Sequence, residues 1–136
     1  MTVVSSGPVA DLVAELGDAA VIDSDTMIAY TRDQALLCPS GRPLAVVRAR
    51  TVDHVVATLK TPPRHGIPGV RGGAGTGLAG GANAIDGCIV LSTEKLDRIL
   101  AVDEQSRTAT VEAGVINGDL ATAVAARGLW YVPDPG

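Results

Sequence analysis

The residues best suited to chemistry lie in one glycine-rich stretch, residues 70–82. It reads Val-Arg-Gly-Gly-Ala-Gly-Thr-Gly-Leu-Ala-Gly-Gly-Ala and holds six of the sixteen glycines in the sequence. Glycine admits positive φ and lets other groups approach the main chain closely, so a run of bare backbone N–H groups can curl around an anion. Arg71 adds a fixed positive charge, and the Thr76 hydroxyl can donate to a phosphate oxygen. The stretch predicts a phosphate-binding loop.

This loop differs from the better known phosphate loops. No Gly-Lys-Ser or Gly-Lys-Thr follows the glycines, which excludes a P-loop. The glycine spacing fits a Rossmann fingerprint poorly, and residues 77–87 are too rich in glycine to begin a packed helix. Two alternatives stay open: a flexible loop without a ligand, and an unrelated phosphate-sugar or nucleotide enzyme. The second needs an acid–base pair, but the nearby carboxylates Asp86, Glu94 and Asp97 are typical of helix starts and solvated surfaces.

Length and composition indicate one compact domain with an aliphatic core. The chain has 136 residues and no Phe, and its aromatic residues are Tyr30, Trp130 and Tyr131. A net charge of -4 without a basic stretch argues against nucleic acid or an anionic membrane as the main partner. Neither a signal peptide nor an apolar run long enough to span a bilayer is evident, so we expect a cytoplasmic protein.

The cysteines and histidines give no sign of a metal site or a disulfide framework. Cys38 and Cys88 are fifty positions apart and form no CxxC pair, so we expect two reduced thiols. His54 and His65 are isolated, whereas a metal site needs three or four convergent ligands.

The elements before the loop are expected to position it at the end of a strand. Apolar spacing predicts a helix over residues 9–16, followed by a loop with a further helical turn up to residue 38. Buried strands are expected at 44–49 and, weaker or at an edge, at 67–71. Between them Thr51 caps a helix that ends early at two prolines. The buried face of that helix is expected to carry Val52, Val55, Val56 and Leu59.

The elements after the loop form a third strand, a hairpin and a helix. The apolar run at 87–92 predicts a strand buried on both faces, followed by a single helical turn over 93–98. Strands at 99–103 and 108–113 flank a polar turn and predict an antiparallel hairpin. Gly114 marks a bend at which the backbone could meet a ligand, and Asn117 caps a helix over 118–127 that Gly128 closes.

Several ordered motifs together resemble one known family. They are Pro-Leu-Ala-Val-Val at 43–47, Thr-Val-Asp-His-Val at 51–55, the glycine loop at 71–81, Leu-Asp-Arg-Ile at 96–99, Val-Glu-Ala-Gly-Val at 111–115 and Pro-Asp-Pro at 133–135. The sequence is similar to the FAD-binding domain of the vanillyl-alcohol oxidase and p-cresol methylhydroxylase superfamily, and within it to glycolate oxidase FAD subunits and D-lactate dehydrogenases. The resemblance implies an α+β (α/β) fold of the PCMH type, with residues 1–42 as a helical and loop leader and 43–136 as the N-terminal part of the FAD-binding domain.

The resemblance also implies which residues bind FAD. The glycine loop would hold the pyrophosphate with main-chain N–H groups, and the Pro-Asp-Pro turn would run beside the cofactor. Some relatives attach flavin covalently through a histidine where Thr76 stands, so the cofactor here should be non-covalent. The residues implied are Arg71, Gly72, Gly73, Ala74, Gly75, Thr76, Gly77, Leu78, Gly80, Gly81, Pro133 and Asp134.

The implied chemistry is oxidation of a small 2-hydroxy acid, with hydride passing to the flavin. The family's second flavin-contact segment, its cap domain and its catalytic residues have no counterpart in this sequence, so we expect a truncated domain that is inactive alone. Pro62-Pro63 and Gly136 are smaller departures from the family's pattern. The alternative is a non-catalytic module that binds a nucleotide or complements a partner subunit. A standalone module should have residues 130–132 covered, whereas a fragment would leave this apolar C-terminal edge exposed and tend to self-associate or bind a partner subunit through it.

Overall fold

A four-stranded sheet forms the centre of the larger part of the protein. The computed structural model describes residues 7–133. The strands run in the order β1-β2-β4-β3, and β1 pairs antiparallel with β2 while β2, β4 and β3 are mutually parallel. Their bounds are Ala20–Val21 for β1, Ala45–Arg48 for β2, Gly69–Gly72 for β3 and Ile89–Ser92 for β4. As expected from its proline and glycine, β3 lies at an edge, whereas β4 is buried along its whole length.

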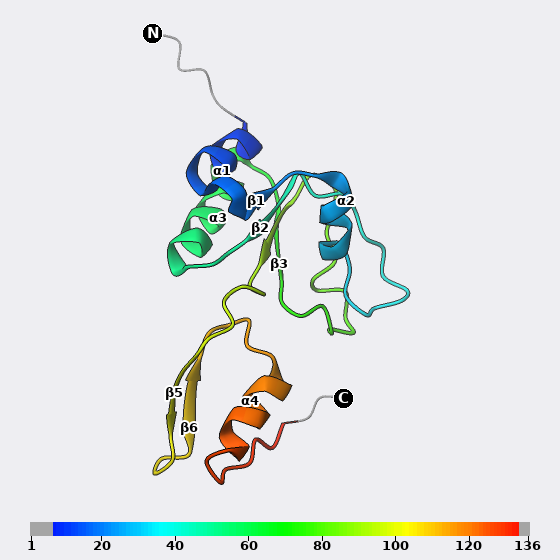
Figure 1. Ribbon diagram of the computed structural model, residues 1–136. Helices are drawn as coiled ribbons and strands as arrows, with labels where there is room; N and C mark the ends of the chain where they lie inside the picture. The colour runs from blue at the N-terminus through cyan, green and yellow to red at the C-terminus, as the bar shows by residue number, and fades with distance from the viewer. Residues whose placement is uncertain (1–6, 134–136) are drawn as a thin grey trace.

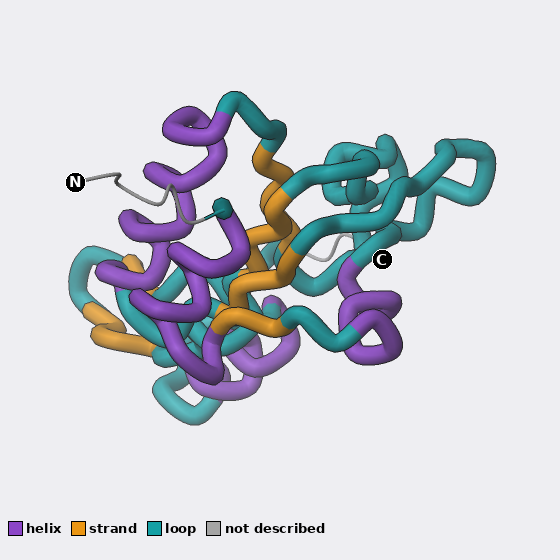
Figure 2. Tube along the Cα trace, turned by 90° about the horizontal axis from the view of Figure 1, so that it is seen from above, coloured by secondary structure: helices purple, strands orange, loops and turns teal. Residues whose placement is uncertain are grey.

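Two helices cover one face of this sheet. Helix α1, Pro8–Leu16, and helix α3, Val52–His65, lie together on that face, and long loops lie on the other (Figures 1 and 2). The short 3-10 helix η1, Gly17–Ala19, leads from α1 into β1. Leu12 and Leu16 of α1 share one hydrophobic cluster with Val47 and Ile89 of the sheet. The first part of the leader is therefore built into the core.

The opposite face of the sheet packs against the rest of the leader. Helix α2, Ser24–Met27, and the 3-10 helix η2, Ile28–Tyr30, lie there. Met27 is buried against Val46, Val90 and Cys88. Asp23 caps α2, because its carboxylate accepts a hydrogen bond from the Thr26 N–H at 2.8 Å. Residues 31–44 then return to β2 without regular structure.

The buried side of α3 differs from the expected one. Val52, Val56 and Leu59 are exposed, and the buried residues are Ala57, Thr58, Thr61 and Pro62. The two threonines can be buried because their hydroxyls donate to main-chain carbonyls four residues earlier, at 2.6 Å for Thr58 and 3.1 Å for Thr61. Of the four residues expected on the buried face, only Val55 packs against the core, beside Leu91 and Leu96, so the prediction was wrong for the other three.

The two prolines of α3 do not end the helix, contrary to expectation. The helix continues through Pro62 and Pro63 to His65. A proline removes its own N–H but keeps its carbonyl, and the Pro62 carbonyl accepts from the N–H groups of Gly66 and Ile67. Gly66, with φ of 64°, ends the helix in the left-handed conformation.

A hairpin and a helix form the smaller part, below the main sheet in Figure 1. Strands β5, Ile99–Asp103, and β6, Thr108–Val111, pair antiparallel as expected. Helix α4, Asn117–Ala125, buries Leu120 and Val124. Asn117 is not the N-cap; that position belongs to Ile116, and the Asn117 side-chain oxygen instead accepts from the Tyr131 hydroxyl at 3.3 Å.

Gly114 joins the two parts. Its N–H donates to the Leu96 carbonyl at 2.8 Å, and a β-carbon there would run into the Thr93 carbonyl oxygen. The close approach expected at this glycine is therefore to protein backbone. Residues 93–98 form a hydrogen-bonded turn and irregular chain where a helical turn was expected. Within residues 7–133, no helix combines the length and the apolar character needed to cross a bilayer.

Candidate functional site

The glycine loop begins where the parallel strands end. It leaves β3 after Gly72, whose carbonyl accepts a hydrogen bond from the Thr93 N–H just beyond β4 at 3.1 Å. Arg48, Ser92 and Gly72 are the last residues of three neighbouring strands and lie in register. The carboxyl edge of a parallel sheet is the usual location of ligand sites in open α/β folds.

The main chain of the loop offers unpaired donors. Among the hydrogen bonds of the described residues, none has a backbone N–H between Gly73 and Ala82 as its donor. The carbonyls of Gly77 and Gly80 do accept hydrogen bonds, from Gln34 and Asn83 respectively. The Thr76 hydroxyl likewise has no protein partner in the described part of the chain. A flexible stretch of N–H groups left unpaired in this way suits an anion such as a phosphate.

The leader fastens the loop from one side. Asn83 is buried, and its side-chain oxygen accepts from the Asp33 N–H at 2.8 Å while its amide nitrogen donates to the carbonyls of Cys38 and Pro39. The Gln34 N–H donates to Gly77 at 2.8 Å. These bonds hold the middle and the C-terminal end of the loop to residues 31–39.

The glycines of the loop are required for different reasons. Gly75 and Gly80 have φ of 71° and 74°, which side chains rarely adopt. A β-carbon at Gly77 would lie 3.3 Å from the Asp33 carboxylate. At Gly72 and Gly81 a β-carbon would meet no protein atom within 4 Å, and at Gly73 its nearest neighbour would be the Thr93 hydroxyl at 3.9 Å. The fold itself therefore does not require glycine at positions 72, 73 and 81.

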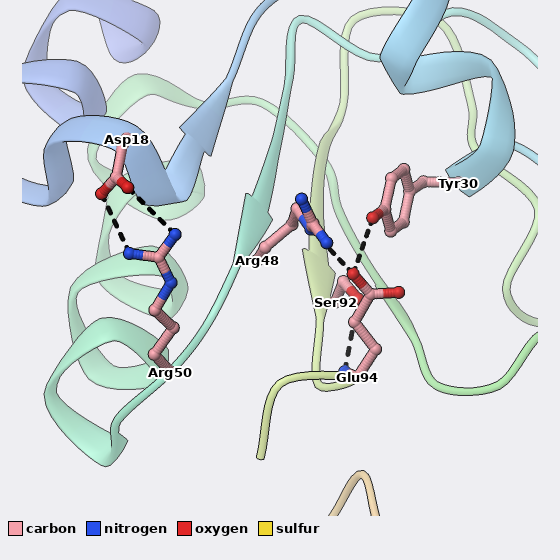
Figure 3. Close-up of polar contacts among 6 residues, drawn as sticks. All are labelled: Asp18, Tyr30, Arg48, Arg50, Ser92 and Glu94. Carbon is pink, nitrogen blue, oxygen red and sulfur yellow. Dashed lines mark hydrogen bonds and ion pairs between the residues drawn. The ribbon is translucent and has the colours of Figure 1, made fainter. Parts of the chain in front are cut away.

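A cavity of about 280 Å³ lies under the first half of the loop. Its lining includes Gly72–Gly75 on one side and Tyr30, Arg32, Ser92 and Glu94 on the others. Figure 3 shows the polar cluster that Tyr30 and Glu94 of this lining form with Arg48. Glu94 Oε1 accepts from the Tyr30 hydroxyl and from Arg48 Nε, both at 2.7 Å. The guanidinium carbon of Arg48 also lies 6.0 Å from the centre of the Tyr30 ring.

Glu94 stays ionised within this cluster. Partial burial alone raises its pKa, but the hydrogen bonds from Tyr30 and Arg48 outweigh it, and the net pKa of Glu94 is lowered. Burial first, and then the hydrogen bond to Glu94, raise the pKa of Tyr30. The bond to Glu94 also raises the pKa of Arg48. Arg48 consequently offsets the charge of the ionised carboxylate. Because Glu94 is held by hydrogen bonds from both Arg48 and Tyr30, it is not available as a base.

Four of the twelve expected site residues, Gly72–Gly75, line the cavity under the loop, whereas Arg71 and Gly81 line a different one. Arg71 follows Val70, whose side chain packs on the α2 side of the sheet. Because strand side chains alternate between the two faces, the Arg71 side chain lies on the α3 side. There it lines a separate cavity of about 580 Å³ with Pro62. Pro133 is exposed at the end of the described chain, and Asp134 lies outside the described residues. Leu78 is 81% exposed.

Sequence reasoning missed the residues that support the loop. Tyr30, Arg48 and Asn83 were not singled out, and Glu94 was interpreted as a solvated or capping carboxylate. Glu94 is instead the centre of a partly buried cluster that joins the leader, β2 and the end of β4. One available signal was the position of Arg48, a lone charge ending an apolar run, since such a charge commonly has a partner.

The fold and loop together define a class: a mixed α+β domain that presents a glycine-rich loop with unpaired N–H groups at the carboxyl edge of a parallel sheet. Residues 43–136 match the family described as FAD binding domain. The D-lactate dehydrogenase of Anaerostipes hadrus is 36% identical over 107 residues, 79% of this chain and 22% of that protein. Glycolate oxidase subunit GlcD of Bacillus subtilis (strain 168) is 41% identical over 93 residues, 68% of this chain and 20% of that protein.

Solved structures agree with the sequence relatives. P-cresol methylhydroxylase with substrate bound has a TM-score of 0.74 at 27% identity, covering 90% of this chain and 24% of that one. Alkyldihydroxyacetonephosphate synthase has a TM-score of 0.78 at 17% identity, covering 91% of this chain and 26% of that one, and supports the fold alone. This chain belongs to the FAD-binding-domain family, which confirms the resemblance and the fold class. It spans 20% to 22% of the length of the two curated relatives above.

The loop also fits the cofactor of this family. The diphosphate of FAD needs hydrogen-bond donors and close access to the main chain, and the unpaired N–H groups of residues 73–82 together with the open space at Gly72 and Gly81 supply both. FAD, predicted from the resemblance, is thus the cofactor that the family and the donor set jointly support.

Proposed function

We propose that this chain is the FAD-holding part of a flavin-dependent oxidoreductase that oxidises a small 2-hydroxy acid. The observation that carries the proposal is the row of backbone N–H groups, residues 73–82, that have no acceptor among residues 7–133 and lie at the carboxyl edge of the sheet. Relatives whose names are D-lactate dehydrogenase and glycolate oxidase subunit support the substrate class. FAD, when bound, supplies the acceptor for the hydride.

The roles that we assign to this chain's residues are binding and orientation. Residues 73–77 donate backbone N–H groups to the diphosphate, and the Thr76 hydroxyl adds a donor. Threonine has no ring nitrogen, so we propose that FAD is held without a covalent bond. Arg71, Leu78 and the Pro133-Asp134 turn are proposed to flank the cofactor beyond this inner set.

We expect the chain alone to be inactive. Glu94 in the cavity lining accepts hydrogen bonds from Tyr30 and from Arg48, and we assign neither Glu94 nor Tyr30 to proton transfer with substrate. The substrate-binding residues of the complete protein belong to other segments in this proposal. We further propose a cytoplasmic location, which suits two cysteines that form no disulfide, Cys38 and Cys88.

A titration with FAD tests this proposal. The purified chain is titrated while the fluorescence of Trp130, the single tryptophan, and the flavin absorbance are followed. We expect saturable binding that weakens in a variant carrying Gly75→Ala and Thr76→Ala, with flavin released on denaturation because no covalent bond holds it. Absence of binding at high FAD concentration would overturn the proposal. Turnover of a 2-hydroxy acid with a dye as electron acceptor would overturn the expectation that the chain alone is inactive.

A second candidate is a non-catalytic module that complements a partner subunit or associates with itself. A standalone module should cover residues 130–132, but Trp130 is 86% exposed and Val132 is 72% exposed. This exposed apolar segment favours the fragment over the module. Size-exclusion chromatography with and without FAD separates the candidates. A chain that associates supports the fragment, whereas a chain that stays monomeric with and without FAD supports the module.

A further inference from the structure

We infer that Arg32 of the leader supplies the positive charge for the diphosphate-binding loop. The sequence had predicted this role for Arg71. The inference rests on the proposed binding of FAD and adds to it a specific side chain outside the glycine motif. Arg32 lines the same cavity as Gly72–Gly75. Arg71 lines the cavity on the other face of the sheet.

The backbone on both sides of Arg32 is fixed against the loop. The Thr31 carbonyl accepts from the Ala84 N–H at 3.0 Å, the Asp33 N–H donates to Asn83 at 2.8 Å, and Gln34 bonds to Gly77. The Arg32 carbonyl lies 3.8 Å from the position of a β-carbon on Gly75. The leader therefore holds the backbone of Arg32 at a constant position beside the proposed anion site.

The side chain of Arg32 is oriented yet keeps donors available. Its Nε donates to the Ser40 hydroxyl at 3.0 Å, which is the single hydrogen bond of this side chain among the described residues. The two terminal nitrogens thus have no protein partner in residues 7–133. A guanidinium with both terminal nitrogens available can bind two phosphate oxygens at once.

The charges around the cavity favour an anion. Glu94 also lines it, but Arg48 pairs with this carboxylate at 2.7 Å and offsets its charge. Asp33 is the other nearby acid; one of its oxygens accepts from the Ala35 N–H, and the other faces Gly77, outside the cavity lining. Arg32 is therefore the cation in the cavity lining that remains for a ligand.

The experiment compares Arg32→Gln with Arg64→Gln, which removes the same charge from exposed Arg64 in the last turn of α3. Each purified chain is titrated with FAD and with riboflavin, which lacks phosphate, at low and high salt. We expect Arg32→Gln to raise the Kd for FAD about fivefold to tenfold and to flatten its salt dependence, with riboflavin binding and the Arg64→Gln variant unchanged. Arg32→Lys should recover part of the loss.

The outcomes separate the inference from the proposed function. If the unaltered chain binds FAD saturably and Arg32→Gln has the same Kd, only the assignment of Arg32 is overturned, and the proposed function stands. A larger loss of FAD affinity in Arg71→Gln than in Arg32→Gln also overturns that assignment. Absence of FAD binding by the unaltered chain overturns the proposed function and the inference with it. Thermal unfolding of each variant checks folding, which we expect to be unchanged because exposed Arg32 makes one side-chain hydrogen bond.

Discussion

Replacing Gly73 by alanine distinguishes a glycine kept for a ligand from a glycine kept for the fold. Gly73 does not have a positive φ, and its added β-carbon would have one neighbour within 4 Å, the Thr93 hydroxyl at 3.9 Å, an ordinary contact. The Gly73 N–H has no acceptor within the described residues. The folded chain can therefore accept alanine, whereas a phosphate lying against this N–H cannot keep its position.

The expected effects have opposite directions. Gly→Ala at a compatible position stabilises a protein by about 0.4–1 kcal/mol, because the unfolded chain loses conformational freedom. Loss of one hydrogen bond to a charged group costs about 1.5–3 kcal/mol, which is about 10- to 150-fold in Kd. Gly73→Ala should thus unfold at the same or higher urea concentration and bind FAD at least about tenfold more weakly.

The assay pairs urea unfolding with FAD titration on Gly73→Ala and on Gly118→Ala. Gly118 lies in α4, and its added β-carbon would meet no protein atom within 4 Å. This control should gain up to about 1 kcal/mol as a helical position and keep the Kd of the unaltered chain. Equal FAD affinity in the two variants would refute the argument that open space at Gly73 is reserved for the ligand.

Three further changes test the parts that support the loop. Asn83→Ala should lower the free energy of unfolding by about 1–3 kcal/mol, because three main-chain groups lose their partner; urea unfolding measures it, and a loss below a few tenths would contradict it. Because the pKa of Glu94 is lowered in the folded protein, the ionised carboxylate stabilises the fold above its ordinary pKa of 4.5, and this stabilisation is lost as the pH falls through the lowered pKa. The difference in unfolding free energy between the unaltered chain and Glu94→Gln should therefore shrink on acidification. A difference that stays constant from neutral pH to below pH 4.5 would argue against this. Gly114→Ala should destabilise the chain by about 1–3 kcal/mol, because the β-carbon runs into the Thr93 carbonyl; a melting temperature equal to that of the unaltered chain would contradict the close approach.

Local patterns predicted the order and type of most elements well. The apolar runs that became β2 and β4, the spacing of α1 and the polar turn of the β5–β6 hairpin all follow from neighbours in sequence. The class of the loop could be predicted for the same reason, since its glycines stand together. Its details depend on the fold: Gly75 needs positive φ, whereas Gly72 and Gly81 do not.

Features that depend on contacts between distant segments were not predicted. The buried face of α3 was assigned to its larger aliphatic residues, but Thr58 and Thr61 pair their hydroxyls within the helix and can be buried, which hydropathy alone does not indicate. Glu94 is separated from Tyr30 by 64 residues and from Arg48 by 46. Such partners share no local pattern, so the cluster emerges only when the sheet brings the three segments together.

The central claim is that backbone N–H groups of the glycine loop bind the diphosphate of FAD, and amide NMR shifts test it most directly. The isotope-labelled chain is titrated with FAD, and with riboflavin as the phosphate-free comparison. We expect the amide resonances of Gly73, Gly75 and Gly77 to shift and to saturate with FAD but not with riboflavin, while those of the β5–β6 turn, residues 104–107, stay in place. Saturation of FAD binding without any shift of the loop amides would contradict the claim.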